Sequence, residues 1–582
     1  TNKNDLWNTI TMKLTPIKGM SINMDYTFNY YSENNKVHMK SFDEYGANGQ
    51  FLQTFAWTNP NSVSQSQAND TYNAFNFFGD YEKTLGKHYL KGMIGYNQES
   101  KHTTGFNAGR EQLISNDLGS LSYATGDRWV GSSDNSWATR SGFFRINYGY
   151  DERYLLEVNG RYDLSSKFPK HDRAVFNPSF SAAWRLSNES WFKSWTNSFF
   201  DELKIRGSYG LVGSDETGLS AGAQHFLYID QVSLNNIGFT TGVDMNYTLY
   251  GPLVTNYAVV NGGWERVKKL DIGIDLELFR QLTITADYFN EKRYNILLHR
   301  EAWPESLGYY TAKPWSNKGK VDNWGIELSV NWRKEFTKDL YVDFRGNFTY
   351  TENKYVNLDE PVYPYVWKTS TGKPLSRTTG YIAQGLFSSQ EEIDNSPTQN
   401  LGSTVKPGDI KYRDVNGDGK IDGSDQVMIS PYGTTPRIQY GLGMNVTYKK
   451  FDFGVFFNGS AKRTIMISGI SPFGQSDYNV MQFIADDYWS ESNPNPNAKY
   501  PRLGLTSSQT ANNTVASTYW MRNGNFIRFK TLELGYKFKY GRVYLNGDNI
   551  AVFSPFKLWD PELSWNAYPL QRTFNIGVQL NF

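Results

Sequence analysis

Apolar and polar residues alternate strictly along several segments of this chain, which limits those segments to one kind of secondary structure. From 438 to 448, every even-numbered residue is Ile, Tyr, Leu, Met or Val, and the residues between them are Gln, Gly, Asn or Thr. Residues 22–30, 270–278 and 324–332 repeat the pattern. Successive side chains of a β-strand point to opposite faces of the sheet. Each segment is therefore predicted to be a strand with one apolar face and one polar face.

The connections between these segments fall into two classes that alternate along the chain. Short connections include 150–152, 280–281 and 449–450. Long connections are predicted at residues 32–71, 98–139, 213–265, 294–321, 353–433 and 462–524. One segment in a short position, 187–202, is predicted to contain a helical turn. The pattern gives about 17 strands of roughly 9–12 residues, a length that crosses a bilayer when the strand is tilted.

Together these features predict an all-β fold, a transmembrane antiparallel β-barrel with long extracellular loops and short periplasmic turns. Aromatic residues make up 16% of the chain and cluster near the predicted strand ends, as in the girdles of such barrels. The alternative is a string of soluble β-sandwich domains, which also alternate. The long and short asymmetry over the whole chain argues against it. The last strand, FNIGVQLNF, carries its apolar face to Phe582, which we interpret as an assembly signal.

Composition excludes several functions. The chain has no cysteine, so it has no disulfide framework, thiolate metal site or cysteine nucleophile. The 59 basic and 58 acidic residues give a formal net charge of +1, which argues against a nucleic-acid partner. The six histidines are scattered without metal-ligand spacing. No catalytic constellation is found, and the chain is predicted not to be an enzyme.

The order of the turns predicts an incomplete barrel. The last strand ends on the short-turn side, whereas Thr1 falls on the long-loop side. Bacterial single-chain barrels have an even number of strands and begin and end on the periplasmic side. An open sheet edge in lipid would leave backbone groups unpaired at a cost of several kcal/mol each. We therefore expect residues 1–582 to be the C-terminal part of one barrel whose first strands lie elsewhere.

Many segments resemble one family, the SusC/RagA-type TonB-dependent transporters of the Bacteroidetes outer membrane. These segments are YLLEVNGRYDLSSKF (154–168), FNPSFSAAWRLSNESWF (176–192), LKIRGSYGLVGSDE (203–216), GGWERVKKLDIGIDLELF (262–279), GKVDNWGIELSVNW (319–332), GYIAQGLFSSQEEI (380–393), GDIKYRDVNGDGKIDGSD (408–425), FIRFKTLELGY (526–536), LNGDNIAVFSPFKLWDPE (545–562) and YPLQRTFNIGVQLNF (568–582). They follow one another in the family order through nearly the whole chain.

This resemblance implies a 22-stranded barrel whose N-terminal plug and first strands are absent from this sequence. It also implies TonB-dependent import of oligosaccharides or oligopeptides with a SusD-like surface lipoprotein as partner. The polar strand faces would then line the lumen, and the apolar faces would contact outer-membrane lipid. Three alternatives stay open: a passive porin, a non-transporting structural subunit of an outer-membrane assembly, and a secreted calcium-dependent binding protein.

The stretch DVNGDGKIDGSD, residues 414–425, has the spacing of a calcium-binding loop. Such a loop takes oxygen ligands from positions 1, 3, 5, 7, 9 and 12 and a glycine at position 6, here Gly419. The candidate ligands are Asp414, Asn416, Asp418, the Lys420 carbonyl, Asp422 and Asp425. We predict a structural calcium ion that orders the long extracellular loop 353–433. The alternative is a set of Asx-turns that need no metal.

Two aromatic segments of the predicted loops are candidates for substrate stacking. Equally, they could pack against a partner or line the barrel mouth. The candidate residues are Trp303, Tyr309, Tyr310, Trp315, Tyr363, Tyr365 and Trp367.

Overall fold

The structure is a computed structural model. It describes the chain apart from residues 56–57, 197–198, 218–225, 260–261, 305, 307–312, 468–479, 505, 565–566 and 582. Phe582, the predicted assembly signal, lies outside the described residues, and its role stays a prediction.

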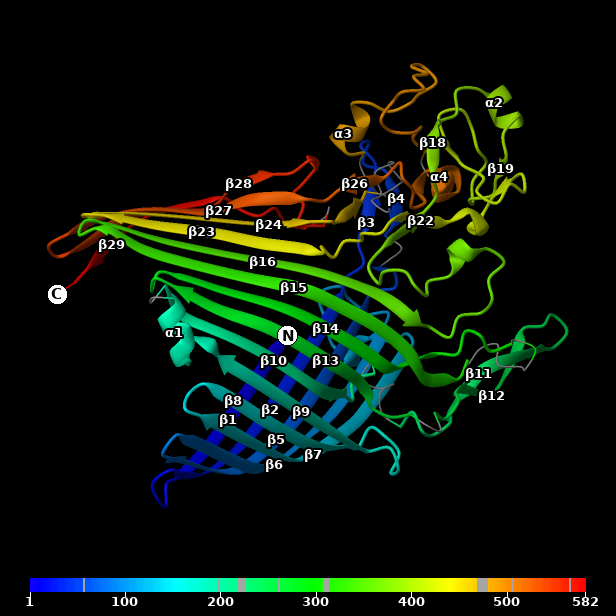
Figure 1. The fold of residues 1–582 in the computed structure, drawn as a ribbon. Coiled ribbons are helices and arrows are strands. Elements are labelled where there is room, and N and C mark those ends of the chain that lie inside the picture. Colours follow the sequence, from blue (N-terminus) through cyan, green and yellow to red (C-terminus); the bar gives the residue numbers. More distant parts are fainter. Residues whose placement is uncertain are drawn as a thin grey trace. The chain divides into compact units, whose positions relative to one another are not determined.

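Seventeen strands form one antiparallel sheet, which confirms the all-β prediction and the predicted strand number (Figure 1). They are β1 (Asn2–Leu14), β2 (Met20–Met39), β5 (Ser62–Leu85), β6 (His88–Glu111), β7 (Arg128–Tyr150), β8 (Tyr154–Ser165), β9 (Ala174–Arg185), β10 (Phe200–Ser214), β13 (Glu265–Leu278), β14 (Leu282–His299), β15 (Trp315–Thr337), β16 (Leu340–Asn357), β23 (Ile438–Tyr448), β24 (Phe451–Ala461), β27 (Phe526–Phe538), β28 (Gly541–Phe553) and β29 (Thr573–Leu580). No helix in the described residues is long and apolar enough to cross a membrane.

Several strands are longer than the sequence predicts. The strands β5 and β6 each have 24 residues, so the prediction of roughly 9–12 is wrong for them. Their pairing runs without a register shift from Leu85 opposite His88 to Ser62 opposite Glu111. Polar residues of the predicted loops therefore continue the hydrogen-bonded ladder beyond the alternating segment.

The chain divides into two compact units, each described by itself. The first contains residues 1–182, 208–268 and 294–318. In it β1, β2, β5, β6, β7 and β8 pair in sequence order. Its long connections carry two hairpins, β3 (Asp43–Tyr45) with β4 (Phe51–Thr54) and β11 (Gln231–Thr241) with β12 (Tyr247–Asn256), and a 3-10 helix η2 (Leu121–Tyr123).

The second unit contains residues 183–207, 269–293 and 319–582. In it β15, β16, β23, β24, β27, β28 and β29 pair in order. The helix α1 (Ser190–Thr196) confirms the helical turn predicted within 187–202. The other short elements are η3 (Leu186–Asn188), η5 (Val366–Lys368), β17 (Thr378–Gly380), β18 (Ala383–Leu386), α2 (Gln390–Asp394), β19 (Thr398–Gln399), β20 (Ile410–Tyr412), β21 (Lys420–Ile421), η6 (Gly423–Asp425), β22 (Val427–Ser430), β25 (Thr464–Met466), α3 (Gln482–Ala485), α4 (Ser507–Thr514) and β26 (Met521–Asn523).

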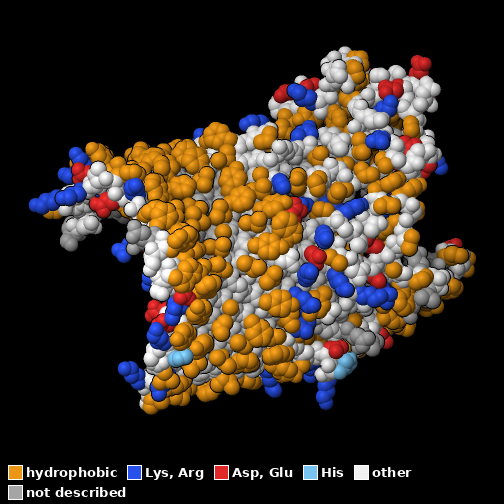
Figure 2. All heavy atoms as spheres, viewed as in Figure 1, with side chains coloured by type: hydrophobic (Ala, Val, Ile, Leu, Met, Phe, Trp, Pro, Cys, Tyr) orange, Lys and Arg blue, Asp and Glu red, His pale blue; other side chains and the backbone are white. Residues whose placement is uncertain are grey.

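Register in the second unit gathers the apolar positions on one face. Residues directly opposite each other in an antiparallel pair project to the same side. Leu442 lies opposite Gly346 on β16 and Phe457 on β24, and Met444 lies opposite Phe344 and Val455. Figure 2 shows hydrophobic side chains gathered over the middle of β16, β23 and β24, with charged side chains at the strand ends. The predicted apolar face is thus continuous across these strands.

Candidate functional site in the long connections

Three long connections of the second unit share one hydrophobic core. The β16–β23 connection contributes Tyr381, Leu386, Ile410, Tyr412 and Ile421, the β24–β27 connection contributes Ile465, Ile467, Ile484, Trp489, Ala498, Tyr500 and Trp520, and the β28–β29 connection contributes Phe556. We call these thirteen buried residues the loop core. Backbone hydrogen bonds join two of these connections, since the Tyr381 N–H donates to the Ala516 carbonyl at 2.9 Å and the Thr464 N–H donates to the Gly433 carbonyl at 2.8 Å. The connections therefore fold together into one packed layer.

A buried amide cluster ties this layer together. Gln399 Nε2 donates to Asn512 Oδ1 at 2.7 Å, and Gln399 Oε1 accepts the Tyr412 N–H at 2.7 Å. Asn513 Oδ1 accepts the Ile410 N–H at 2.9 Å. Burial raises the pKa of the Tyr412 phenol, whose O–H donates to the Asn512 carbonyl at 2.8 Å. Because buried polar groups need partners, these bonds fix the β20 strand against α4.

One buried ion pair extends the cluster. Asp409 has no exposed surface, and its Oδ1 lies 2.7 Å from Arg502 Nε. Asn513 Nδ2 donates to the same carboxylate at 2.7 Å, and the Lys406 N–H donates to it at 2.9 Å. Burial raises the pKa of Asp409, while the Arg502 guanidinium acts against that rise. Removing either partner would leave the other charge buried and unpaired.

The stretch 414–425 lies beside this core as a series of turns. Asp414 accepts the N–H groups of Gly417, at 2.6 Å, and Gly419, at 2.9 Å. Asp418 Oδ1 accepts the Lys420 N–H, and the Asp422 side chain caps η6 by accepting the Ser424 N–H. This bond holds the pKa of Asp422 below its usual range. These contacts match the Asx-turns of the alternative interpretation.

The last candidate calcium ligand, Asp425, is turned toward the backbone. It is fully buried, its Oδ1 accepts the Val415 N–H at 2.8 Å, and its Oδ2 accepts the Asp422 N–H at 2.9 Å. Among the described residues, no group of three or more His, Cys, Asp or Glu side chains is arranged to hold a metal. Hydrogen bonds close these turns by themselves, and calcium stays a prediction from the sequence.

The candidate aromatic residues lie in two separate places. In the second unit, Tyr365 and Trp367 stack with ring centroids 4.8 Å apart. Trp367 Nε1 donates to the Ser424 carbonyl at 2.8 Å, and the Tyr365 hydroxyl accepts from Asn416 Nδ2 at 3.0 Å. This pair supports the 414–425 turns, a role that leaves less of each ring for stacking on a substrate.

The remaining aromatic candidates show mixed outcomes. Tyr363, two residues before Tyr365 in the sequence, is half-buried. In the first unit, the Trp315 ring lies 3.6 Å from that of His299, and the Arg300 guanidinium lies 5.0 Å from the Trp303 ring. Tyr309 and Tyr310 lie outside the described residues. No common stacking surface is therefore established by these side chains.

The polar strand faces carry charge networks. Arg206 on β10 contacts Asp271, at 3.1 Å, and Asp275 on β13, and it contacts Asp287 on β14 at 2.6 Å. Lys204 adds a second contact to Asp275 at 3.1 Å. Asp271 and Asp275 occupy polar positions of the alternating segment 270–278, whose polar side chains are predicted to share one face. The sequence pattern did not single out Arg206, although its alternation with Ile205 places it on that face.

Sequence comparison finds known proteins that are similar to this chain. A family model described as TonB dependent receptor-like, beta-barrel matches residues 2–550. The chain is 26% identical over 97% of its length to the TonB-dependent receptor SusC of Bacteroides thetaiotaomicron, covering 55% of that protein. It is 26% identical over 86% of its length to the TonB-dependent receptor P3 of Formosa agariphila, covering 51% of it. The chain thus spans about half the length of the curated relatives it matches.

One solved structure shares the fold over the whole chain. It is described as the RagAB peptide transporter, and it matches with a TM-score of 0.75 and 19% identity. The match covers 100% of this chain and 62% of that one. At this identity the match supports the fold alone.

Proposed function

The chain belongs to the TonB-dependent receptor-like β-barrel family of the outer membrane, and on that premise we propose that it forms the barrel of a nutrient importer. The imported molecules would be oligosaccharides or oligopeptides. The observation that carries the proposal is the family match over residues 2–550, together with the RagAB peptide transporter as a structural neighbour. The family consists of receptors and transporters, not enzymes.

The strand faces suit such a barrel. The apolar face of β16, β23 and β24 would contact lipid, because a barrel satisfies its backbone groups between strands. The polar face, with Arg206, Asp271 and Asp275, would contact water and passing solutes. A barrel of this width leaves a lumen that needs a plug. TonB would act on that plug, using the inner-membrane proton gradient.

We further propose a SusD-like surface lipoprotein as the partner that closes the extracellular mouth. The loop core supports this proposal because a packed layer presents a fixed surface to a lid. Val362 and Val366 belong to the β16–β23 connection and are almost fully exposed. A preformed surface loses less conformational entropy when it binds a partner than a flexible loop does.

The alternatives are a passive porin and a non-transporting structural subunit. Uptake of labelled oligosaccharides and labelled peptides by cells that carry the full-length protein separates all three. An importer accumulates one substrate class, and the accumulation stops when TonB is deleted. A porin lets solute equilibrate with or without TonB. A structural subunit gives the same uptake as a deletion strain, and that result would contradict the proposal.

A further inference from the structure

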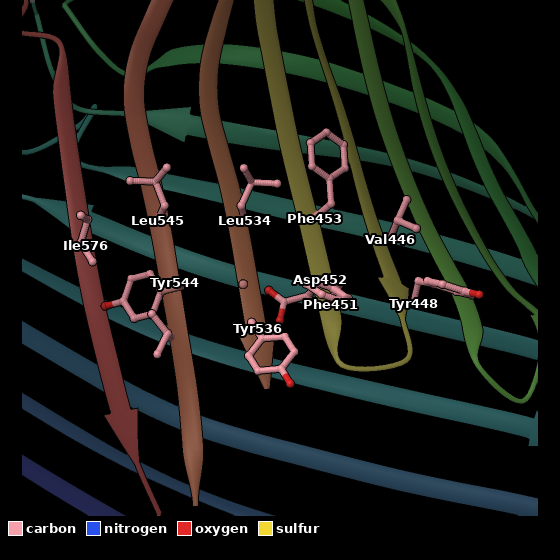
Figure 3. A pocket seen from close by; sticks show the side chains of 12 residues that line it. Val446, Tyr448, Phe451, Asp452, Phe453, Leu534, Tyr536, Tyr544, Leu545 and Ile576 are labelled. Carbon is pink, nitrogen blue, oxygen red and sulfur yellow. The ribbon is translucent and has the colours of Figure 1, made fainter. Parts of the chain in front are cut away.

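The lipid-facing side of the last strands is hollowed near their short turns. The hollow has a volume of about 520 Å³, within the range of about 300–1,000 Å³ usual for ligand pockets. Figure 3 shows the side chains that line it, projecting from β23, β24, β27, β28 and β29 close to the turns. Every residue named from it below belongs to the second unit.

Two rows of directly opposed residues build the hollow. One row runs Tyr448, Phe451, Tyr536 and Val543 across β23, β24, β27 and β28. The row farther from the turns runs Val446, Phe453, Leu534, Leu545 and Ile576. The first row contains three aromatic rings, with Phe451 and Tyr536 only 5.0 Å apart. Aromatic side chains at this level mark the membrane interface of a barrel.

Lysines without acidic partners surround the interfacial end of this hollow. Lys449 and Lys450 form the β23–β24 turn directly between Tyr448 and Phe451, and Lys539 lies in the β27–β28 turn. Lys334 lies opposite Val342, which lies opposite Val446, so it belongs to the same face. In the part of the chain that the structure describes, none of these four lysines forms an ion pair.

Some basic residues near the short turns are neutralised. Arg542, the second residue of β28, contacts both Asp452 and Glu533. In the first unit, Lys87 lies 3.0 Å from Asp151, and Arg153 lies 2.6 Å from the same carboxylate. Lys449, Lys450 and Lys539, by contrast, carry positive charge without a counterion at two turns beside the hollow. Lys449 and Lys539 instead lie over the rings of Tyr448, at 5.5 Å, and Tyr540, at 4.9 Å.

We propose that this hollow binds one anionic phospholipid, with acyl chains along the two apolar rows and the phosphate between Lys449, Lys450 and Lys539. An apolar surface at acyl-chain depth combined with cations at headgroup depth matches both parts of that molecule. Basic clusters beside membrane-spanning segments attract anionic headgroups, at about fivefold in affinity for each lysine. A zwitterionic lipid offers no net charge to the same cluster. The site is independent of any imported substrate.

The test uses the full-length protein, purified in a neutral detergent and incubated with equal amounts of phosphatidylglycerol and phosphatidylcholine of the same chain length. Native mass spectrometry then counts the lipid retained. Wild type is expected to retain phosphatidylglycerol at least tenfold over phosphatidylcholine, with the preference falling at high salt, because salt screens exposed charges. Equal retention of the two lipids would overturn the proposal.

Two variants locate the site. The triple variant Lys449→Gln, Lys450→Gln, Lys539→Gln should lose most of the preference, whereas the matched control Lys87→Gln, at a neutralised turn, should keep it. These positions are exposed and make no packing contacts in the core, so heat resistance on gels should match wild type. Inorganic phosphate added in excess should not displace the lipid. Displacement by phosphate, or an unchanged preference in the triple variant, would refute a phospholipid site here.

Discussion

The long connections of the two units bury their large apolar side chains to different extents. The connections of the second unit meet in the loop core, where Trp520 is 1% exposed. The β11–β12 hairpin of the first unit carries Phe239, Val243 and Met245, which are 71%, 102% and 73% exposed. Both segments contain large apolar residues. The difference is that three connections contribute to the loop core, whereas β11 and β12 form a separate two-stranded sheet in the described part of the first unit. Burial therefore depends on how many segments meet.

The largest loss of stability is expected from a substitution in the loop core. Trp520→Ala should destabilise the loop core by about 3–5 kcal/mol, because it removes a buried ring and its Nε1–H bond of 2.7 Å to the Asn513 carbonyl. Hydrogen exchange within residues 378–430 should accelerate. The matched control Phe239→Ala, in the hairpin, should change stability by less than about 0.5 kcal/mol. Equal effects of the two variants would contradict the comparison.

The second largest loss of stability is expected from a change in the buried ion pair of Asp409 and Arg502. Asp409→Asn should cost about 3 kcal/mol, because Arg502 would lose its charged partner in a buried place. The measurement is the denaturant needed to expose the loop core to protease. The control Lys499→Gln breaks the exposed pair with Asp487 and should cost no more than about 0.5 kcal/mol. If Lys499→Gln lowered stability as much as Asp409→Asn does, burial of the ion pair would not explain the cost.

The strand faces give a third comparison. Leu442→Arg places a charge on the lipid-facing side and should cost about 2–4 kcal/mol if the residue lies near the bilayer midplane. Gly443→Arg is a poor control, because a Cβ there would lie 2.9 Å from Arg345 Nε. Asn445→Arg, on the exposed polar face, is the better match and should be tolerated. Equal heat resistance of the Leu442 and Asn445 variants would refute the assignment of faces.

A smaller effect depends on pH. The Ser388 N–H donates to the Glu392 carboxylate at 2.8 Å, and this bond holds the pKa of Glu392 below its ordinary value of 4.5. A lowered folded-state pKa contributes stability above the unfolded value, and that contribution is lost as pH falls through the folded value. Protection of α2 should therefore weaken below about pH 4.5 in wild type. Glu392→Gln should remove this pH dependence, and an unchanged profile would contradict the assignment.

Calcium gives the smallest expected effect, because hydrogen bonds already close the 414–425 turns. If the predicted ion binds, a chelator should increase protease cutting within these residues and leave the heat resistance of the barrel unchanged. Identical cutting patterns with calcium and with chelator would contradict the predicted ion.

Whether a feature could be predicted from the sequence depends on how far apart along the chain its interacting residues lie. Strand faces depend on alternation between neighbours, so Leu442 and Asp271 could be assigned to opposite faces. The loop core depends on contacts such as Gln399 with Asn512, which are 113 residues apart, and no local pattern pairs them. The calcium prediction used spacing that Asx-turns share, because Asp and Asn bind backbone N–H groups as readily as cations. The burial of Asp425 and its bonds to the Val415 and Asp422 N–H groups could not be read from that spacing.

Hydrogen exchange of the full-length protein in a bilayer can show whether the three connections fold as one layer. The amides of Tyr381, Ile467 and Phe556, one from each connection, are expected to exchange slowly and at a common rate, since each is hydrogen-bonded within this layer. Amides of the β11–β12 hairpin should exchange much faster. Independent rates for the three connections, or protection no greater than that of the hairpin, would contradict it.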